Sequence, residues 1–243
     1  MKLTVRGALA AIFILAMCAL CVRLGLWQLD RLEQRRARNA AIHAATAQPP
    51  LRLDFAAPAA LASDPRSFAW RRAEAAGRYH HAGDMVLRGR SRQGQPGVHL
   101  VSPLVLADGR VVMVNRGWVP SPDGSTADVR ALRTGGAVRV SGALLPIASH
   151  PDRGMPIAGR AGADTTWRRV DLAAARERSP GPVIPLVLQQ LSEGLETGEP
   201  PVPEPLPALS EGNHLSYALQ WFSFAVIGVT GLFILLLRSR KTA

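Results

Sequence analysis

The sequence predicts a membrane protein in which two transmembrane α-helices flank a β-rich extracytoplasmic domain, a small antiparallel barrel or sandwich. Two stretches, 7–22 and 215–237, carry no formal charge, and an apolar helix of about 20 residues crosses a bilayer. Between them, short runs with β-branched residues alternate with turn residues. The 29 basic and 18 acidic residues give an excess of positive charge that is concentrated beside the two apolar stretches. This composition excludes a plain soluble protein and argues against a nucleic-acid-binding face.

The first span is the weaker of the two. Its uncharged core is short, so we expect the transmembrane helix to cover 7–29, with Arg23 reaching toward an interface and Trp27 in an aromatic belt. Residues 1–6 form a cytoplasmic N-terminus. No small-x-small site follows the core, which favours an uncleaved anchor over a secretory signal peptide. The helix is expected to continue as a charged, Arg-rich stalk, 30–48, that ends before two prolines.

Runs with β character are predicted between turn signals throughout the domain 49–199. They cover 68–76, 85–90, 98–106, 111–119, 138–145, 167–170 and 183–188. The Asp108-Gly109 pair between the third and fourth runs is the strongest hairpin signal in the chain, and 173–178 is expected to form one short helix. The Pro-rich residues 200–213 predict a stiff tether. The domain contains no cysteine, so its stability is not expected to depend on disulfides.

Charge flanking the second span, 214–237, predicts the orientation in the membrane. All three basic residues of the C-terminal segment 238–243 lie directly after this span, and basic residues stay on the cytoplasmic side. With two spans the N-terminus is then also cytoplasmic, which agrees with Lys2 and Arg6, and the middle domain is periplasmic. The Arg-rich stalk lies outside in this arrangement, against the rule. Three interpretations of it are open: a contact for acidic lipid headgroups, a contact for a partner subunit, or a merely solvated helix.

The motifs in the chain do not predict an enzyme. There is no zinc-type spacing, no Gly-x-Ser-x-Gly and no Walker loop. Cys18 and Cys21 have the spacing of redox and metal motifs, but they lie in an apolar helix without a neighbouring histidine or carboxylate, where cysteine behaves as a small hydrophobe. Together with Gly25 and Gln28 they form a stripe of small and polar side chains that lets another helix approach closely.

His214 lies at the outer mouth of the second span and is the main candidate for a ligand site. At helical spacing it shares a face with Tyr217, Ala218, Trp221, Ala225 and Gly228. An imidazole, two flat aromatic rings and small residues would admit a planar ligand or a closely packed helix. Two interpretations are open, an interfacial anchor that reaches water and an axial ligand of haem iron.

Arg116 ends an apolar strand next to Gly117, which would allow an unusual backbone conformation or a close approach. Two roles are open for this arginine. It is either part of a structural ion pair or an exposed contact for a carboxylate or propionate.

Motifs along nearly the whole chain resemble the Surfeit-locus-one family, the two-span assembly factors of haem-copper cytochrome c oxidase. They are Leu24-Gly-Leu-Trp-Gln-Leu-Asp-Arg31, Gly77-Arg-Tyr79, the hairpin Pro-Leu…Asp-Gly…Val-Asn-Arg-Gly-Trp-Val-Pro120, and His214-Leu-Ser-Tyr-Ala-Leu-Gln-Trp221. The hairpin and the second-span motif are specific together, whereas Trp27-Gln28 alone would be weak. Residues 146–166 match no pattern of the family.

The resemblance implies a non-enzymatic function in oxidase assembly. The family is implicated in delivering haem to oxidase subunit I, and some bacterial members bind haem A through the histidine that His214 matches. It implies haem A as a transient cofactor held by His214, with Tyr217, Trp221 and Arg116 as further pocket candidates, and subunit I, haem A synthase and membrane lipid as partners. The alternative is a scaffold that stabilises a subunit I intermediate without binding haem.

The expected location is a bacterial inner membrane. The apolar run begins almost at Met1, without a leader of the mitochondrial type.

Overall fold

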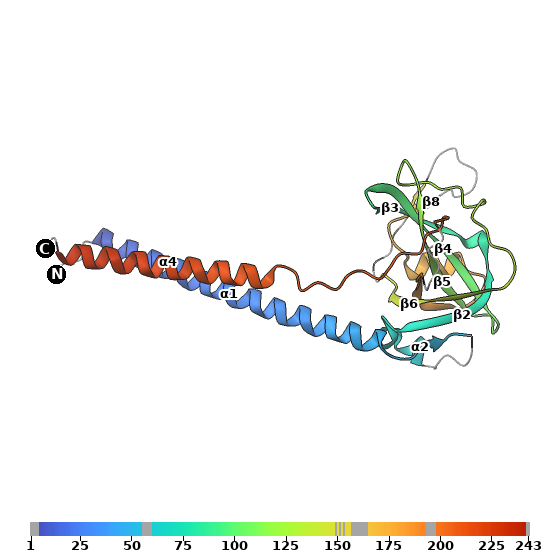
Figure 1. The fold of residues 1–243 in the computed structure, drawn as a ribbon, viewed down its shortest axis with the longest axis horizontal. Coiled ribbons are helices and arrows are strands. Elements are labelled where there is room, and N and C mark those ends of the chain that lie inside the picture. Colours follow the sequence, from blue (N-terminus) through green and yellow to red (C-terminus); the bar gives the residue numbers. More distant parts are fainter. Residues whose placement is uncertain are drawn as a thin grey trace. The chain divides into compact units, whose positions relative to one another are not determined.

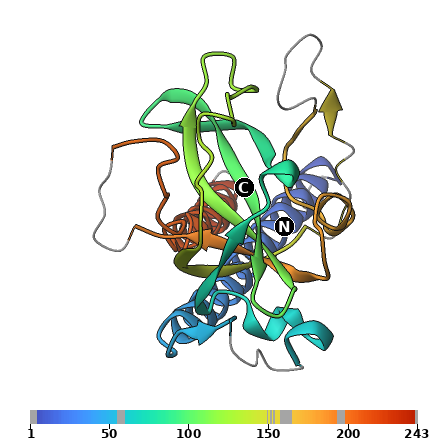
Figure 2. The same ribbon diagram turned by 90° about the vertical axis from the view of Figure 1, so that its right-hand side faces the viewer.

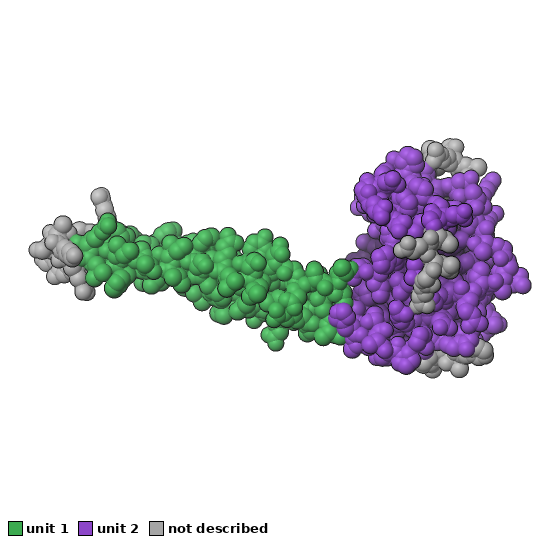
Figure 3. Space-filling model, viewed as in Figure 1, with its two compact units in different colours: residues 1–41, 208–243 green, residues 42–207 purple. Residues whose placement is uncertain are grey.

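The computed structural model describes residues 5–54, 60–148, 150, 152, 154–156, 165–192 and 198–241. Lys2, which entered the orientation argument, lies outside the described residues, as do the side chains of Arg6, Arg240 and Lys241. Two compact units make up the chain (Figure 3). The first consists of residues 1–41 and 208–243, and the second of residues 42–207.

Two long helices, α1 (Val5–Thr46) and α4 (His214–Lys241), lie side by side in the first unit (Figure 1). Both are long and apolar enough to cross a membrane, over Gly7–Thr46 and His214–Arg238. Their large apolar side chains are mostly exposed, with Phe13 at 66% and Ile227 at 67%. Water would penalise such surfaces and hydrocarbon would not, so the pair has the character of a membrane anchor.

The contact between α1 and α4 uses the stripe of small residues, as the sequence predicts. Cys18, Cys21 and Ala225 are buried against one another. A side chain at Gly228 would lie 2.5 Å from Cys18 Sγ, and one at Gly25 would lie 2.5 Å from the Phe222 ring. Both glycines therefore allow the helices to approach as closely as they do. The helix α1 continues beyond its apolar section as far as Thr46, within the segment expected to form the stalk.

The second unit is a β-barrel with additional strands. The strands are β1 (Leu51–Arg52), β2 (Arg72–Tyr79), β3 (Met85–Arg92), β4 (Gln95–Leu106), β5 (Val111–Pro120), β6 (Val138–Pro146), β7 (Met155–Pro156), β8 (Thr165–Trp167) and β9 (Val183–Gln190). Their order in the sheet is β1-β2-β6-β9-β5-β4-β3-β8-β7. Pairing of β2 with β4 closes β2, β6, β9, β5 and β4 into a barrel, and Figure 2 shows the sheet curled upon itself.

The strand directions correct one expectation. The predicted barrel was antiparallel, but β9 pairs with β5 in parallel. Parallel neighbours need a crossover connection, and the chain between these two strands includes β6 and the short helix α3 (Leu172–Glu177). Asp171 begins this helix, since its carboxylate accepts hydrogen bonds from the backbone N–H groups of Ala173 and Ala174. The helix lies within a residue of the predicted one.

Other short helices surround the barrel. They are α2 (Ala60–Ser63) and the 3-10 turns η1 (Pro65–Phe68) and η2 (His81–Gly83). The turn η1 and a positive φ of 69° at Trp70 occupy the beginning of the predicted run 68–76, so β2 starts later than expected.

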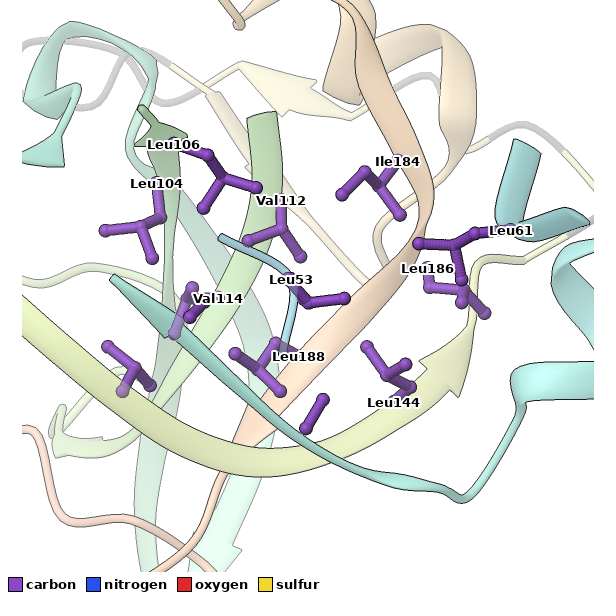
Figure 4. Packing of buried hydrophobic residues seen from close by; sticks show 13 residues of the cluster. Leu53, Leu61, Leu104, Leu106, Val112, Val114, Leu144, Ile184, Leu186 and Leu188 are labelled. Carbon is purple, nitrogen blue, oxygen red and sulfur yellow. The ribbon is translucent and has the colours of Figure 1, made fainter. Parts of the chain in front are cut away.

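The core of the second unit contains mostly leucine and valine side chains from neighbouring strands (Figure 4). Successive residues of β5 contribute to different clusters: Val112 and Val114 pack with Leu104 and Leu188, whereas Met113 packs with Met85 and other residues of a second cluster. Both faces of β5 are therefore buried. This explains why its sequence is continuously apolar instead of alternating.

The Pro-rich tether is fastened to the barrel near its start. Val202 is buried and exchanges two backbone hydrogen bonds of 2.8 Å with Trp118 at the end of β5. Gly117 has a φ of +122°, and a side chain on it would overlap the Val202 carbonyl. The close approach expected at Gly117 is confirmed, and its function is to seat the tether.

Candidate functional site

His214 is the first residue of α4, and its partner comes from the other helix. Its Nδ1 lies 2.8 Å from Oε1 of Gln28 on α1, and the imidazole is partly buried. The two residues are 186 positions apart in the chain. The polar end of the small-residue stripe on α1 thus meets the polar end of α4, at the point where both helices leave their apolar sections.

The hydrogen bond sets the chemistry of the imidazole. An amide oxygen only accepts, so Nδ1 carries the proton, and Nε2 of the neutral ring keeps its lone pair. Histidines that bind metals commonly donate their other N–H to a carbonyl or carboxylate, which fixes the ring and its tautomer. Gln28 gives His214 a partner of this kind. In the neutral tautomer, Nε2 is therefore the ring nitrogen that can accept a hydrogen bond or bind a metal ion.

Gly212 lies two residues before His214 and has a φ of +72°. Glycine adopts this backbone conformation without strain. A side chain built at this position would lie 3.5 Å from Nε2 of His214, which is ordinary van der Waals contact. The turn before the helix therefore passes close to the imidazole.

Other members of the predicted face of α4 have separate roles. Ala218 and Ala225 are buried against α1, and Trp221 is partly buried and packs edge-on against Phe224 with ring centroids 5.9 Å apart. Tyr217 is 50% exposed. The structure therefore brings Trp221 into the helix contact and leaves Tyr217 at its margin.

Two stalk arginines hold the segment that precedes α4. The guanidinium of Arg36 donates two hydrogen bonds of 2.9 Å to the carboxylate of Glu211, and Arg35 and Asn39 both donate to the Ser210 carbonyl. Each exposed contact contributes little by itself. Together they fix the register between α1 and the start of α4, which is also the register of Gln28 with His214.

Arg116 belongs to β5 of the barrel. It is only 7% exposed, it lies 4.9 Å above the ring of Tyr79, and it donates to Thr134 Oγ1 at 2.9 Å. Among the described residues no carboxylate pairs with it. Burial raises the pKa of Tyr79 to about 12, so the ring stays neutral beneath the cation. This burial favours a role in the barrel over contact with an external propionate.

A buried polar network lies at the seat of the tether. The His99 ring lies 3.2 Å from Nδ2 of Asn115 and, through Nε2, 2.8 Å from the Glu204 carboxylate. Asn115 also donates to Gln189 at 2.8 Å. Burial, aided by the nearby cation of Arg90, lowers the pKa of His99, although Glu204 opposes the shift. A neutral His99 can accept from Asn115 and donate to Glu204, which fastens the tether to the barrel.

The remaining residues offer no metal or redox centre within the part of the chain that the structure describes. No cluster of three or more histidine, cysteine or acidic residues is found there. Cys18 and Cys21 are buried free thiols in the helix contact. The polar groups with a defined chemical state are therefore those at the mouth of the helix pair and those in the barrel.

The sequence alone does not identify Gln28 as a site residue. Its helical spacing places it in the packing stripe, and nothing near it in the sequence connects it with His214. One signal is available, because a polar residue at the end of an apolar span is uncommon and often functional.

Comparison with known proteins gives matches over most of the chain. The sequence model of the SURF1 family matches residues 15–226. A SURF1-like protein of Monosiga brevicollis is 26% identical over 228 residues, which cover 84% of this chain and 78% of that protein. The matched range includes both Gln28 and His214.

Proposed function

The chain belongs to the SURF1 family, and from this premise we propose that it assists the assembly of haem-copper cytochrome c oxidase by binding haem A transiently for insertion into subunit I. Family membership is consistent with oxidase assembly, and the two apolar helices are consistent with a membrane location. We further propose an inner-membrane site of action with the barrel on the outer side. Haem A synthase is the proposed donor of the haem, and subunit I the recipient.

One observation carries the haem proposal: Gln28 accepts the Nδ1 proton of His214 at 2.8 Å. In the neutral ring this hydrogen bond places the lone pair on Nε2. Haem, when bound, would supply an iron centre that this nitrogen could ligate. Gln28 orients the ring before the haem arrives, so less entropy is lost on binding.

A single histidine suits a carrier better than two. The described part of the helix pair contains one other histidine, His43, on α1. It lies fifteen residues beyond Gln28, or about 22 Å along the helix axis, too far to ligate the same iron. One axial bond leaves haem less tightly held than a two-ligand site would, which allows transfer to the oxidase.

The scaffold alternative loses part of its support. It relies on two surfaces for a partner helix, the stripe of Cys18, Cys21, Gly25 and Gln28 and the face with Ala218 and Ala225. In the structure these two surfaces contact each other. A scaffold would have to use the other, exposed apolar surface of the helices.

The test is an absorption spectrum of the detergent-purified chain from cells that make haem A. We expect a bound-haem spectrum in the parent, loss of at least 90% of the haem in His214→Ala, and parental haem content in the control His43→Ala. Gln28→Leu should retain His214 but lose its orientation, so haem content should fall about tenfold, or about 1.4 kcal/mol in affinity. Gln28→Glu keeps an acceptor and should preserve binding.

Equal haem content in His214→Ala and the parent would exclude the ligand role. A protein without pigment that still copurifies with subunit I, equally well in the parent and in His214→Ala, would support the scaffold. Loss of haem in His214→Ala together with unaltered copurification of subunit I would separate cargo binding from partner binding.

A further inference from the structure

The barrel contains a hollow of about 540 Å³ that plays no part in the proposed haem site. Residues Arg88–Arg90 of β3, residues 123–125 after β5, and Arg168 after β8 line it. The backbone N–H of Gly89 donates to the Gly124 carbonyl at 2.8 Å, which joins two of these segments. Its volume lies in the range of small-molecule sites.

The arginines of this hollow are oriented by neutral groups. Arg88 donates through Nη1 to the Thr166 carbonyl at 2.7 Å, and Arg90 donates through Nη2 to the Arg168 carbonyl at 2.7 Å. A carbonyl acceptor holds a guanidinium in place without forming an ion pair with it. Two fixed forks of donors with remaining N–H groups match the oxygens of a carboxylate or phosphate.

Arg90 provides a second observation. Its Nε is buried and has no hydrogen-bond partner among the described residues. A buried donor that is left unpaired has a cost. Burial lowers the pKa of Arg90, and the charge of Glu204 opposes this shift only in part. An anion in the hollow would offer the unpaired donor an acceptor and the partly buried cation a further counter-charge.

The carboxylates nearby are engaged with other donors. Asp123 accepts hydrogen bonds from the side chains of Thr126 and Ser121 and from the backbone N–H of Ser125, which lower its pKa. Asp152 accepts from the backbone N–H groups of the 168–169 segment and of Gly154. Glu204 contacts His99. Within the lining itself, three arginines outnumber one carboxylate.

We propose that this hollow binds a small organic anion with two or more carboxylate or phosphate groups, held by the guanidinium groups of Arg88, Arg90 and Arg168. The net positive lining matches a dianion, and the volume exceeds what a single inorganic ion would fill. The proposal concerns the barrel alone and does not depend on haem.

Isothermal titration calorimetry of the detergent-purified full chain tests it. Pyrophosphate and citrate serve as probes for the phosphate and carboxylate sources, each measured against sodium chloride at matched ionic strength. Arg90→Gln and Arg168→Gln remove one lining charge each. Because the Arg168 side chain is exposed, Arg168→Gln should fold without difficulty. Arg78→Gln on β2 removes the same charge outside the hollow and is the matched control.

We expect saturable binding of at least one probe to the parent and to Arg78→Gln, weakened tenfold or more in Arg90→Gln and in Arg168→Gln. The preferred probe identifies the anion class. Absence of saturable binding of both probes to the parent would overturn the proposal. Equal affinity of the parent and of Arg168→Gln for the probe would overturn it too, because Arg168 would then not contribute to binding.

Discussion

His99 shows at the scale of one residue how burial changes a side chain that would be ordinary on a surface. Its imidazole is 12% exposed and lies between Asn115 and Glu204. The pKa of His99 is lowered mainly by burial and further by the cation of Arg90, and Glu204 only partly offsets this. The ring is therefore neutral in the folded protein under conditions in which an exposed histidine begins to take up a proton.

The lowered pKa predicts a pH dependence of stability. Below the ordinary histidine value of about 6.5, the unfolded chain takes up a proton at position 99 and the folded barrel does not. The free energy of unfolding should therefore decline as the pH falls through this range, by up to about 1.4 kcal/mol per pH unit. The decline should end once the pH passes the folded pKa. His99→Gln should show a flatter decline, measured as thermal unfolding midpoints followed by tryptophan fluorescence.

The control for this prediction is His43→Gln, which removes an exposed histidine on α1. The stability of this variant should decline with falling pH in parallel with that of the parent. If the stability of His99→Gln also declines in parallel with that of the parent, proton uptake at His99 does not contribute to the pH dependence. This holds whatever the absolute loss of stability in that variant.

At the scale of the element, the helix pair depends on contacts that only small residues permit. Gly228 on α4 faces Cys18 on α1, whereas nothing lies within 4 Å of a side chain built at Gly231. The two glycines are one turn apart on the same apolar helix, so they have similar surroundings in a bilayer but different neighbours in the protein. This difference gives a direct test of the packing.

Gly228→Cys should form a disulfide with Cys18 when membranes are treated with a copper–phenanthroline oxidant, because the new side chain lies against the thiol. After protease cleavage in the barrel, the two spans should remain joined on a non-reducing gel. Gly231→Cys should give no joined fragments, and Gly228→Cys with Cys18→Ala should give none either. Equal cross-linking at both positions would contradict the packing.

At the scale of the whole molecule, the charge next to the second span sets the proposed orientation. Arg238, Arg240 and Lys241 follow the span, and the segment before it contains only Glu204 and Glu211 as charged residues. Under the rule that basic residues remain inside, this charge supports the proposal that both termini are cytoplasmic and the barrel lies outside. The stalk arginines still conflict with the rule, because acidic partners such as Glu211 contribute little to it.

The orientation is tested with alkaline phosphatase, which is active only outside the cytoplasm. A fusion in the loop at Gly136 should be active, and one after Ala243 should be inactive. Replacing the three basic residues after the span by Gln should produce a mixed orientation, because the flanking charge difference is lost. The control replaces Arg130, Arg133 and Arg139 of the barrel by Gln and should keep the parental pattern. Strong activity of the C-terminal fusion in the parent would refute the orientation.

The sequence by itself determined the helices and most of the strands. An uncharged run of more than 20 residues has few stable states other than a membrane helix, and Asp108-Gly109 between two apolar runs is a hairpin signal with a local cause. These features depend on residues close together in the chain. The small-residue stripe was readable for the same reason, because its spacing along one helix is a local property.

The tertiary structure decided which strands pair and which distant side chains contact each other. The closure of β2 on β4, the parallel pairing of β9 with β5, and the contacts of His214 with Gln28 and of His99 with Glu204 all join residues that are distant in sequence. Many pairings satisfy the same local pattern, and only the simultaneous packing of the core and the helix pair selects one of them. The sequence therefore identified the imidazole of the candidate site, and the fold supplied the amide that sets its tautomer.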